Sequence, residues 1–249
     1  MIRPLKVRGL TLGDGIPKIC VPLTPSSMEE LQSQIAQMTP GTYDLVEWRL
    51  DYLPPDVDYA EMYRQIRGRL MDTPLLATFR TAGEGGQKAI SAADYHSLYE
   101  RLLNLGVDLI DLEWRLGESV YHPLLESARL HGAHAIFSYH DFQKTPSKEE
   151  ILRILTAMQA SGADLVKIAL MPHCLEDVLT LLSASDEMFR LHAHCPLITM
   201  SMGRLGMISR LCGAYSGSAV TFGACGASSA PGQPDAALLR SILSSVNPC

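Results

Sequence analysis

Short apolar runs rich in β-branched residues recur along the chain and alternate with longer amphipathic stretches. The runs are Lys18–Leu23, Tyr43–Asp51, Pro74–Arg80, Leu109–Trp114, Ala133–Asp141, Asp164–Leu170, Pro196–Met202 and Ala219–Gly223. The first residues of successive runs lie 25, 31, 35, 24, 31, 32 and 23 residues apart, the length of one strand, one helix and two loops. No Asn-Gly or Asp-Gly pair joins neighbouring runs, so the pattern predicts parallel strands connected by helical crossovers.

Signals for the ends of helices lie between these runs. Three motifs are typical of helix N-termini: Ser26-x-x-Glu29, Ser91-x-x-Asp94 and Ser147-x-x-Glu150. Pro234 suits a first helical position. Three glycines stand where a left-handed residue would end a helix: Gly106, Gly132 and Gly162. Each predicted strand is therefore followed by a predicted helix.

Repeated strand-then-helix units without a break in composition fit a closed barrel better than an open sheet. We expect an α/β fold, a (β/α)8 TIM barrel that forms a single domain over residues 1–249. Residues 1–17 precede the first barrel strand and are predicted to form a short hairpin or cap. The 249 residues, of which 47% are hydrophobic, can bury a large core, which excludes a mainly disordered chain.

The charge pattern argues against nucleic acid as a partner. The chain has 27 acidic and 21 basic side chains, a net charge of −6, and no run of lysines or arginines that could follow a phosphate backbone. The segment Met1–Arg8 lacks the apolar core of a signal peptide, and nowhere do 18 apolar residues follow one another. We therefore expect a soluble cytoplasmic protein that does not bind a membrane.

Cysteines and histidines do not form a recognisable metal motif. The six cysteines, at positions 20, 174, 195, 212, 225 and 249, include no CxxC pair, and we expect free thiols. The nearest approach to a metal cluster is His192, His194 and Cys195, with His173 and Cys174 earlier in the chain. Neither its spacing nor its supporting carboxylates match a zinc site, so no metal is expected.

Polar side chains crowd the positions where barrel enzymes carry their chemistry, the carboxyl ends of the strands. They are Glu47 and Arg49, Arg80 and Glu84, His140, Lys167, Arg204 and Arg210, and the loop Ser228–Gln233. Lys167 lies inside an apolar strand, where burial disfavours an ammonium and makes a neutral amine more accessible as a Schiff-base nucleophile. The alternative is a lysine paired with a barrel carboxylate such as Glu47 or Glu113.

The other residues admit two interpretations each. Glu47 and Arg49 share one face of a strand and, with Arg80, could bind substrate hydroxyl groups or form a structural ion-pair network. His140 is a candidate general acid and base that Glu84 could orient, or a structural histidine. The glycines around Glu84 match neither a P-loop nor a dinucleotide-binding turn, which argues against a nucleotide.

Several of these segments resemble the type I 3-dehydroquinate dehydratases. The matching segments are Glu47-Trp-Arg49, Arg80-Thr-x-x-Glu84-Gly-Gly86, Ser138-Tyr-His140-Asp-Phe, Lys167 within Leu-Val-Lys-Ile-Ala, Met200-Ser-Met-Gly203, Ile208-Ser-Arg210-Leu, Thr221-Phe-Gly223 and Ser229-Ala-Pro-Gly-Gln233. They follow the order of that family over residues 18–240. The resemblance implies a (β/α)8 lyase of the shikimate pathway, without metal or organic cofactor, that converts 3-dehydroquinate to 3-dehydroshikimate through an imine.

The resemblance also implies roles for individual residues. Lys167 would form the Schiff base, His140 would transfer protons, and Glu84 would be the partner of His140. Arg210 would pair with the substrate carboxylate. Further substrate contacts would come from Glu47, Arg49, Arg80, Ser229 and Gln233, the last two from a lid. Members of this family are commonly homodimers, so we expect a homodimer here.

One position departs from the family pattern, because Pro22 stands where a serine is frequent. A secondary substrate contact is therefore expected to be missing. Two other functions remain open at this stage. One is a Schiff-base aldolase, which also uses a barrel lysine. The other is a barrel that binds metabolites without catalysis.

Overall fold

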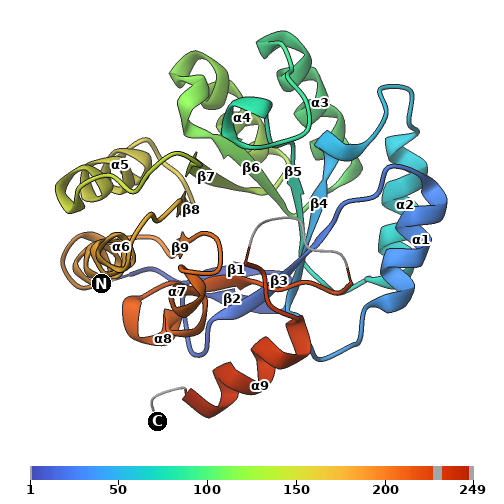
Figure 1. The fold of residues 1–249 in the computed structure, drawn as a ribbon. Helices are drawn as coiled ribbons and strands as arrows, with labels where there is room; N and C mark the ends of the chain where they lie inside the picture. The colour runs from blue at the N-terminus through green and yellow to red at the C-terminus, as the bar shows by residue number, and fades with distance from the viewer. Residues whose placement is uncertain (1, 227–231, 247–249) are drawn as a thin grey trace.

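The eight apolar runs form one sheet of parallel strands that curls into a barrel (Figure 1). The computed structural model describes residues 2–226 and 232–246. The strands are β3 (Lys18–Leu23), β4 (Leu45–Arg49), β5 (Leu75–Thr78), β6 (Leu109–Glu113), β7 (His134–Asp141), β8 (Leu165–Leu170), β9 (Leu197–Ser201) and β10 (Val220–Phe222). Their order in the sheet is β10-β3-β4-β5-β6-β7-β8-β9. The last gap is bridged where Ala219 N donates to Leu197 O at 2.7 Å, so the predicted barrel is confirmed.

Helices surround this barrel as an outer ring (Figure 1). The α-helices are α1 (Met28–Gln37), α2 (Tyr59–Arg69), α3 (Ala92–Leu105), α4 (Glu118–Leu130), α5 (Lys148–Ala160), α6 (Leu175–Glu187), α7 (Met207–Leu211), α8 (Gly213–Ser216) and α9 (Ala236–Val246). Shorter turns of helix are η1 (Leu50–Tyr52), η2 (Ala82–Glu84), η3 (Trp114–Leu116) and η4 (Met188–His192). The longer helices bury one apolar stripe against the sheet, as α5 does with Ile151, Ile154, Leu155 and Met158.

The predicted helix ends are mostly confirmed. The side chains of Ser91 and Ser147 accept hydrogen bonds from the third residue of α3 and α5. Gly106, Gly132 and Gly162 all have positive φ, at 89°, 70° and 94°. Such left-handed residues stop the helix and favour glycine.

Two predicted helix starts are wrong. Helix α1 is capped by Ser27, one residue later than expected, because the Ser27 hydroxyl accepts from Glu30 N while Ser26 binds the Glu30 carboxylate. Pro234 lies before α9, not inside it. Its carbonyl accepts from Ala224 N at 2.8 Å, which ties it to the residues that follow β10. The helix then begins after Asp235, whose carboxylate accepts from Leu238 N.

A two-stranded antiparallel hairpin precedes the barrel, as predicted for residues 1–17. Its strands are β1 (Leu5–Val7) and β2 (Leu10–Leu12). Val7 and Leu12 are buried in the same apolar cluster as Leu45, Leu76 and Leu109 from the amino ends of barrel strands. The hairpin therefore contributes to the apolar packing at the amino end of the barrel.

The interior of the barrel changes from apolar to polar along the strands. The apolar layer near the amino ends contains Cys20, Leu45, Leu76, Leu109, Ile136, Leu165, Ile198 and Val220. Two residues farther along five successive strands, on the same face, come Glu47, Thr78, Asp111, Ser138 and Lys167, all buried. The polar positions are thereby gathered at the carboxyl ends of the strands.

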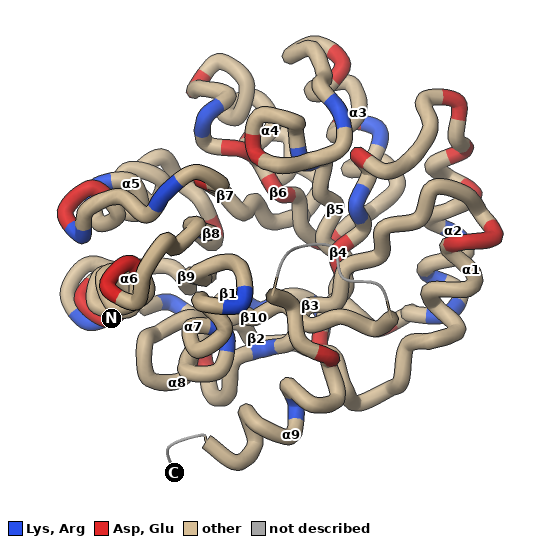
Figure 2. Tube along the Cα trace, in the orientation of Figure 1, with Lys and Arg blue, Asp and Glu red and all other residues tan. Residues whose placement is uncertain are grey.

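Charge on the outside of the barrel is mixed. Figure 2 shows acidic and basic residues interspersed on outer helices such as α5, without a long stripe of one sign. None of the helices among the described residues has the length and apolar character needed to cross a membrane. Cys20, Cys174, Cys195, Cys212 and Cys225 are free thiols, and Cys249 lies outside the described residues.

Candidate active site

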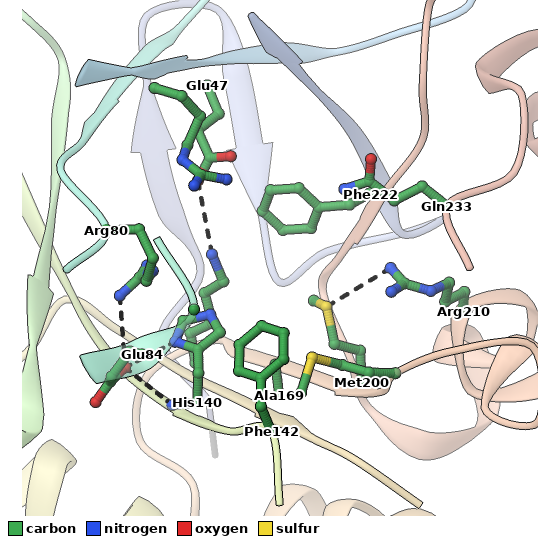
Figure 3. Close-up of a pocket in the computed structure, with 14 residues that line it drawn as sticks. Glu47, Arg80, Glu84, His140, Phe142, Ala169, Met200, Arg210, Phe222 and Gln233 are labelled. Atoms are coloured by element: carbon green, nitrogen blue, oxygen red, sulfur yellow. Dashed lines mark hydrogen bonds and ion pairs between the residues drawn. The ribbon is translucent and has the colours of Figure 1, made fainter. Parts of the chain in front are cut away.

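A cavity opens at the carboxyl ends of the strands. Every predicted site residue that the structure describes lines it: Glu47, Arg49, Arg80, Glu84, His140, Lys167, Arg210 and Gln233. Ser229, the ninth predicted residue, lies outside the described part of the chain. Arg80, Glu84 and His140 lie on one side of the cavity, and Arg210 and Gln233 lie on the other (Figure 3).

Lys167 reaches the cavity from β8 with only 4% of its surface exposed. Its Nζ lies 3.4 Å from Asp111 Oδ2 and 3.7 Å from Glu47 Oε1. It also lies 4.5 Å from the centre of the Phe222 ring. Two carboxylates and an aromatic face therefore surround the amine.

The sequence interpretation anticipated one of these carboxylates and missed the other. Glu47 is confirmed as a partner of Lys167. Glu113 is not a partner; it accepts from Arg80 Nη1 at 3.0 Å and from Thr81 N at 2.7 Å. In the strand register, Ser138 of β7 pairs with Glu113 of β6 on one side and with Lys167 of β8 on the other. Register alone would therefore place Glu113 nearest to Lys167. The stagger of barrel strands instead brings Asp111, two residues earlier, to the amine. Its signal in the sequence was a charged residue inside the otherwise apolar Leu109–Leu112.

His140 and Glu84 form a buried pair beside Lys167. His140 Nδ1 lies 2.9 Å from Glu84 Oε2, and the same oxygen accepts from the backbone N of His140 at 3.0 Å. The next residue, Gly85, has a φ of 85°, and a Cβ there would lie 2.3 Å from the Phe142 ring. A side chain at position 85 would displace the Phe142 ring, and the left-handed φ of the turn that presents Glu84 favours glycine.

The electrostatics of this pair favour an uncharged imidazole. Burial, with the positive charges of Arg80 and Lys167, lowers the pKa of His140 well below its usual range. Burial also raises the pKa of Glu84 to about 8, although Arg80 acts in the opposite direction. Near neutral pH the imidazole is therefore uncharged and can accept a proton, which is what a general base requires.

Arg80 is held by carboxylates. Its Nη2 lies 2.7 Å from Asp111 Oδ1, and its Nη1 lies 3.0 Å from Glu113 Oε1 and 3.5 Å from Glu84 Oε2. Burial alone would lower its pKa, but these carboxylates raise the pKa well above its ordinary value. The ion-pair network considered from the sequence is therefore present around Arg80, although this side chain also lines the cavity.

Glu47 and Arg49 extend the same wall of the cavity. Glu47 Oε1 accepts from Thr78 Oγ1 at 2.9 Å. Arg49 donates through two nitrogens to Asp51, at 2.9 and 2.8 Å. Fixed charges on neighbouring strands give this wall both donors and acceptors for a polyhydroxylated ligand.

The opposite wall is mainly apolar. Met200 and Met202 of the β9 region and Phe222 of β10 line it, with Arg210 approaching from α7. Arg210 Nη1 lies 3.6 Å from Met200 Sδ, and burial lowers the pKa of Arg210 to about 10. Phe142 and Phe222 complete the lining; the sequence interpretation had quoted both only as parts of motifs.

The described residues contain no group of three or more histidine, cysteine, aspartate or glutamate side chains arranged to hold a metal ion. The cationic groups in the cavity are side chains: Lys167, Arg49, Arg80 and Arg210. The arrangement offers a buried amine, a buried acid–base pair and a guanidinium on the far wall. It suits nucleophilic attack on a carbonyl and proton transfer next to it.

Comparison with known proteins identifies the family of the chain. The sequence model of the type I 3-dehydroquinase family matches residues 19–248. A 3-dehydroquinate dehydratase of Bacillus licheniformis is 47% identical over 248 residues, which cover 98% of this chain and 97% of that protein. The chain belongs to the type I 3-dehydroquinase family. A second dehydratase, from Clostridioides difficile, is 43% identical over 247 residues, covering 98% of this chain and 97% of that protein.

Solved structures of type I 3-dehydroquinases have the same fold. The Clostridium difficile enzyme, solved with covalently modified comenic acid, superposes with a TM-score of 0.94 at 43% identity, covering 99% of this chain and 98% of that one. The 3-dehydroquinate dehydratase of Geobacillus kaustophilus superposes with a TM-score of 0.92 at 35% identity, covering 98% of this chain and 96% of that one. A 3-hexulose-6-phosphate synthase of Salmonella typhimurium, 12% identical with a TM-score of 0.59 over 92% of this chain and 99% of that one, shares only the fold.

Proposed function

We propose that this type I 3-dehydroquinase removes water from 3-dehydroquinate through an imine on Lys167. Membership of the family makes the chain a hydro-lyase of the shikimate pathway. What we add is the assignment of its steps to side chains. The observation that carries it is the buried Lys167 amine, which lines one cavity together with the His140–Glu84 pair and Arg210.

In the first step the Lys167 amine attacks the ring ketone, and loss of water gives the imine. Asp111 and Glu47, at 3.4 and 3.7 Å, offset the positive charge of the protonated imine. The electron-poor iminium then accepts the electron pair left when the neighbouring carbon loses a proton. Expulsion of the ring hydroxyl as water forms the double bond, and hydrolysis of the imine releases 3-dehydroshikimate.

His140 is the residue that we assign to proton transfer. Its uncharged imidazole removes the proton next to the iminium and then returns it to the departing hydroxyl. Glu84 fixes the orientation of the ring through Nδ1, at 2.9 Å. Burial and the surrounding cations, which lower the pKa of His140, keep it available as a base near neutral pH.

The remaining residues are assigned to binding. Arg210 pairs with the substrate carboxylate, which its burial and its lowered pKa favour, since an anion would stabilise the buried guanidinium. Glu47, Arg49 and Arg80 bind hydroxyl groups from the opposite wall. Gln233 borders the cavity beside Arg210 and is assigned to substrate binding, as is Ser229, which lies outside the described residues.

Trapping the imine tests this assignment. We expect borohydride, added during incubation with 3-dehydroquinate, to give a covalent adduct that intact mass and peptide mapping place on Lys167. Formation of the enone product should be visible by its ultraviolet absorbance in the absence of borohydride. An active protein without an adduct on Lys167, or with the adduct on another lysine, would refute the imine assignment.

We also propose that the enzyme is a cytoplasmic homodimer that works without a metal or organic cofactor. Exposed apolar side chains on α6 and η4 support self-association: Leu175 is 60%, Leu179 55% and Leu191 63% exposed. Light scattering should give a molar mass of twice the 27.3 kDa of one chain. Activity should survive dialysis against a chelator if no metal is needed. A mass of one chain at working concentration would contradict the dimer.

A further inference from the structure

Asp51 is a buried carboxylate next to the cavity that the proposed reaction does not use. It lies in η1, directly after β4, and it is fully buried. It does not line the cavity itself. A buried carboxylate without compensating contacts would destabilise the fold, so the partners of Asp51 show what it does.

The first partner is Arg49, which does line the cavity. Asp51 Oδ1 accepts from Arg49 Nε at 2.9 Å, and Oδ2 accepts from Nη2 at 2.8 Å. This two-point contact fixes both the position and the plane of the guanidinium. Burial works to lower the pKa of Arg49, but the hydrogen bonds to Asp51 and the charge of Glu47 raise it.

The second partner is the backbone of the turn that carries Glu84. Asp51 Oδ1 accepts from the backbone N of Arg80 at 3.4 Å, and Oδ2 accepts from the backbone N of Gln87 at 3.1 Å. These two residues are the ends of the turn. The two ends of the turn lie close together, because a Cβ on Gly86, the residue before Gln87, would lie only 1.8 Å from Arg80 O.

We infer that Asp51 is a positioning residue that aligns Arg49 and the Glu84 turn with each other. One carboxylate joins a side chain of the substrate-binding wall to both ends of the turn that holds the His140 partner. The inference rests on the proposed function, because it assumes that Arg49 binds substrate and that Glu84 orients His140. It adds that both depend on a single group outside the cavity.

Replacement by asparagine tests this role. Asp51→Asn keeps the shape of the side chain but removes its charge and one of its two acceptor oxygens. We expect KM to rise because Arg49 is released, and kcat to fall because the Glu84 turn shifts. Together they should lower kcat/KM by about 10- to 100-fold, the range that a displacement of about 1 Å produces. The borohydride adduct on Lys167 should still form, since the contacts of Lys167 are unchanged.

Two further variants separate positioning from a general loss of stability. Asp108→Asn is the matched control, because Asp108 also accepts from two arginines, Arg8 and Arg67, and from the backbone N of Leu75. It precedes β6, at the end of the barrel opposite the cavity. It should lower Tm and leave kcat and KM unchanged. Arg49→Ala should raise KM with a smaller change in kcat. A kcat that is lower in Asp51→Asn than in Arg49→Ala would therefore show the effect of the displaced Glu84 turn.

Kinetic constants of Asp51→Asn equal to those of the parent would overturn the inference. A lowered Tm with unchanged constants, as in the control, would do the same, because it would make Asp51 merely structural. If Asp51→Asn does not fold, Asp51→Glu keeps the charge while displacing the carboxylate by one methylene. It should shift KM and kcat in the same directions, and unchanged constants in that variant would refute the inference. A parent without turnover or adduct would instead refute the proposed function.

Discussion

The two walls of the cavity are built from the same barrel but have opposite chemistry. On the β4–β8 wall each buried cation lies beside a carboxylate, as Arg80 does with Asp111 and Glu113. On the β9–β10 wall the strands present Met200 and Phe222, and Arg210 enters from α7 among them. The pKa values follow this contrast. Carboxylates raise the pKa of Arg80 despite its burial, whereas burial lowers the pKa of Arg210 to about 10.

We expect this difference to orient the substrate. The carboxylate-rich wall can accept a new positive charge, which is what the protonated imine that we propose on Lys167 would bring. The apolar wall favours an added anion, because a carboxylate next to Arg210 would stabilise a cation that burial disfavours. We therefore expect the ring ketone to face β8 and the ring carboxylate to face α7. The predictions below test each wall in turn.

Removing the nucleophile from the charged wall should have the largest effect. Lys167→Ala should abolish the adduct and lower kcat by about 10⁴-fold or more, since Lys167 is the one lysine among the described residues that line the cavity. Steady-state rates and intact mass after borohydride treatment measure both. Lys148→Ala, at the start of α5 where the lysine pairs with Glu187 away from the cavity, should keep parental activity. An adduct in Lys167→Ala would assign the imine to another amine.

Removing the base from the same wall should have the next largest effect. His140→Ala should lower kcat by about 10²- to 10⁴-fold, the usual contribution of a positioned acid–base group. Slow formation of the Lys167 adduct should remain, because the amine and its two carboxylates are unchanged. The control is His134→Ala, at the other end of β7, where the ring lies 3.7 Å from Asp164. Parental turnover in His140→Ala would contradict the role of His140.

The apolar wall should respond through binding. Arg210→Ala removes the guanidinium that we assign to the substrate carboxylate, and it should raise KM by about 100-fold, with kcat less affected. Arg210→Lys keeps a charge but loses the planar two-point geometry, so it should recover part of this loss. Initial-rate kinetics measure both constants. If KM stays at the parental value in Arg210→Ala, the carboxylate binds elsewhere and the proposed orientation is wrong.

Both walls contain contacts that the sequence did not predict, although it predicted the strands that carry them. The spacing of apolar runs predicted all the barrel strands, because each strand must bury both faces whatever its neighbours are. The types of polar residue at the strand ends were likewise visible. Asp111 as partner of Lys167 was not predicted, because contacts across the interior depend on the stagger between strands. Phe222 was not predicted as a contact of Lys167 for the same reason.

Local competition explains the errors at helix ends. Ser26 and Ser27 are adjacent, and only the backbone geometry decides which hydroxyl caps α1 and which binds Glu30. Pro234 has the φ of a first helical residue, but its hydrogen bond to Ala224 belongs to tertiary structure. Composition and spacing therefore specify the barrel and the kind of chemistry, whereas the individual partners depend on packing.

The smallest predicted effect concerns stability on the charged wall. Glu84 has its pKa raised from 4.5 to about 8, so the native state holds a proton that the unfolded state loses, and stability should fall as pH rises through this window. Below pH 6.5 the lowered pKa of His140 has the opposite effect, so the loss should be clearest between pH 6.5 and 8. This loss of stability amounts to at most about 2 kcal/mol, or about 4–8 °C in Tm.

Thermal melts at several pH values test this effect. Tm should depend less on pH in Glu84→Gln, while Glu118→Gln, an exposed control on α4, keeps the parental slope. Equal slopes in parent and Glu84→Gln would show that Glu84 is ionised in the free enzyme.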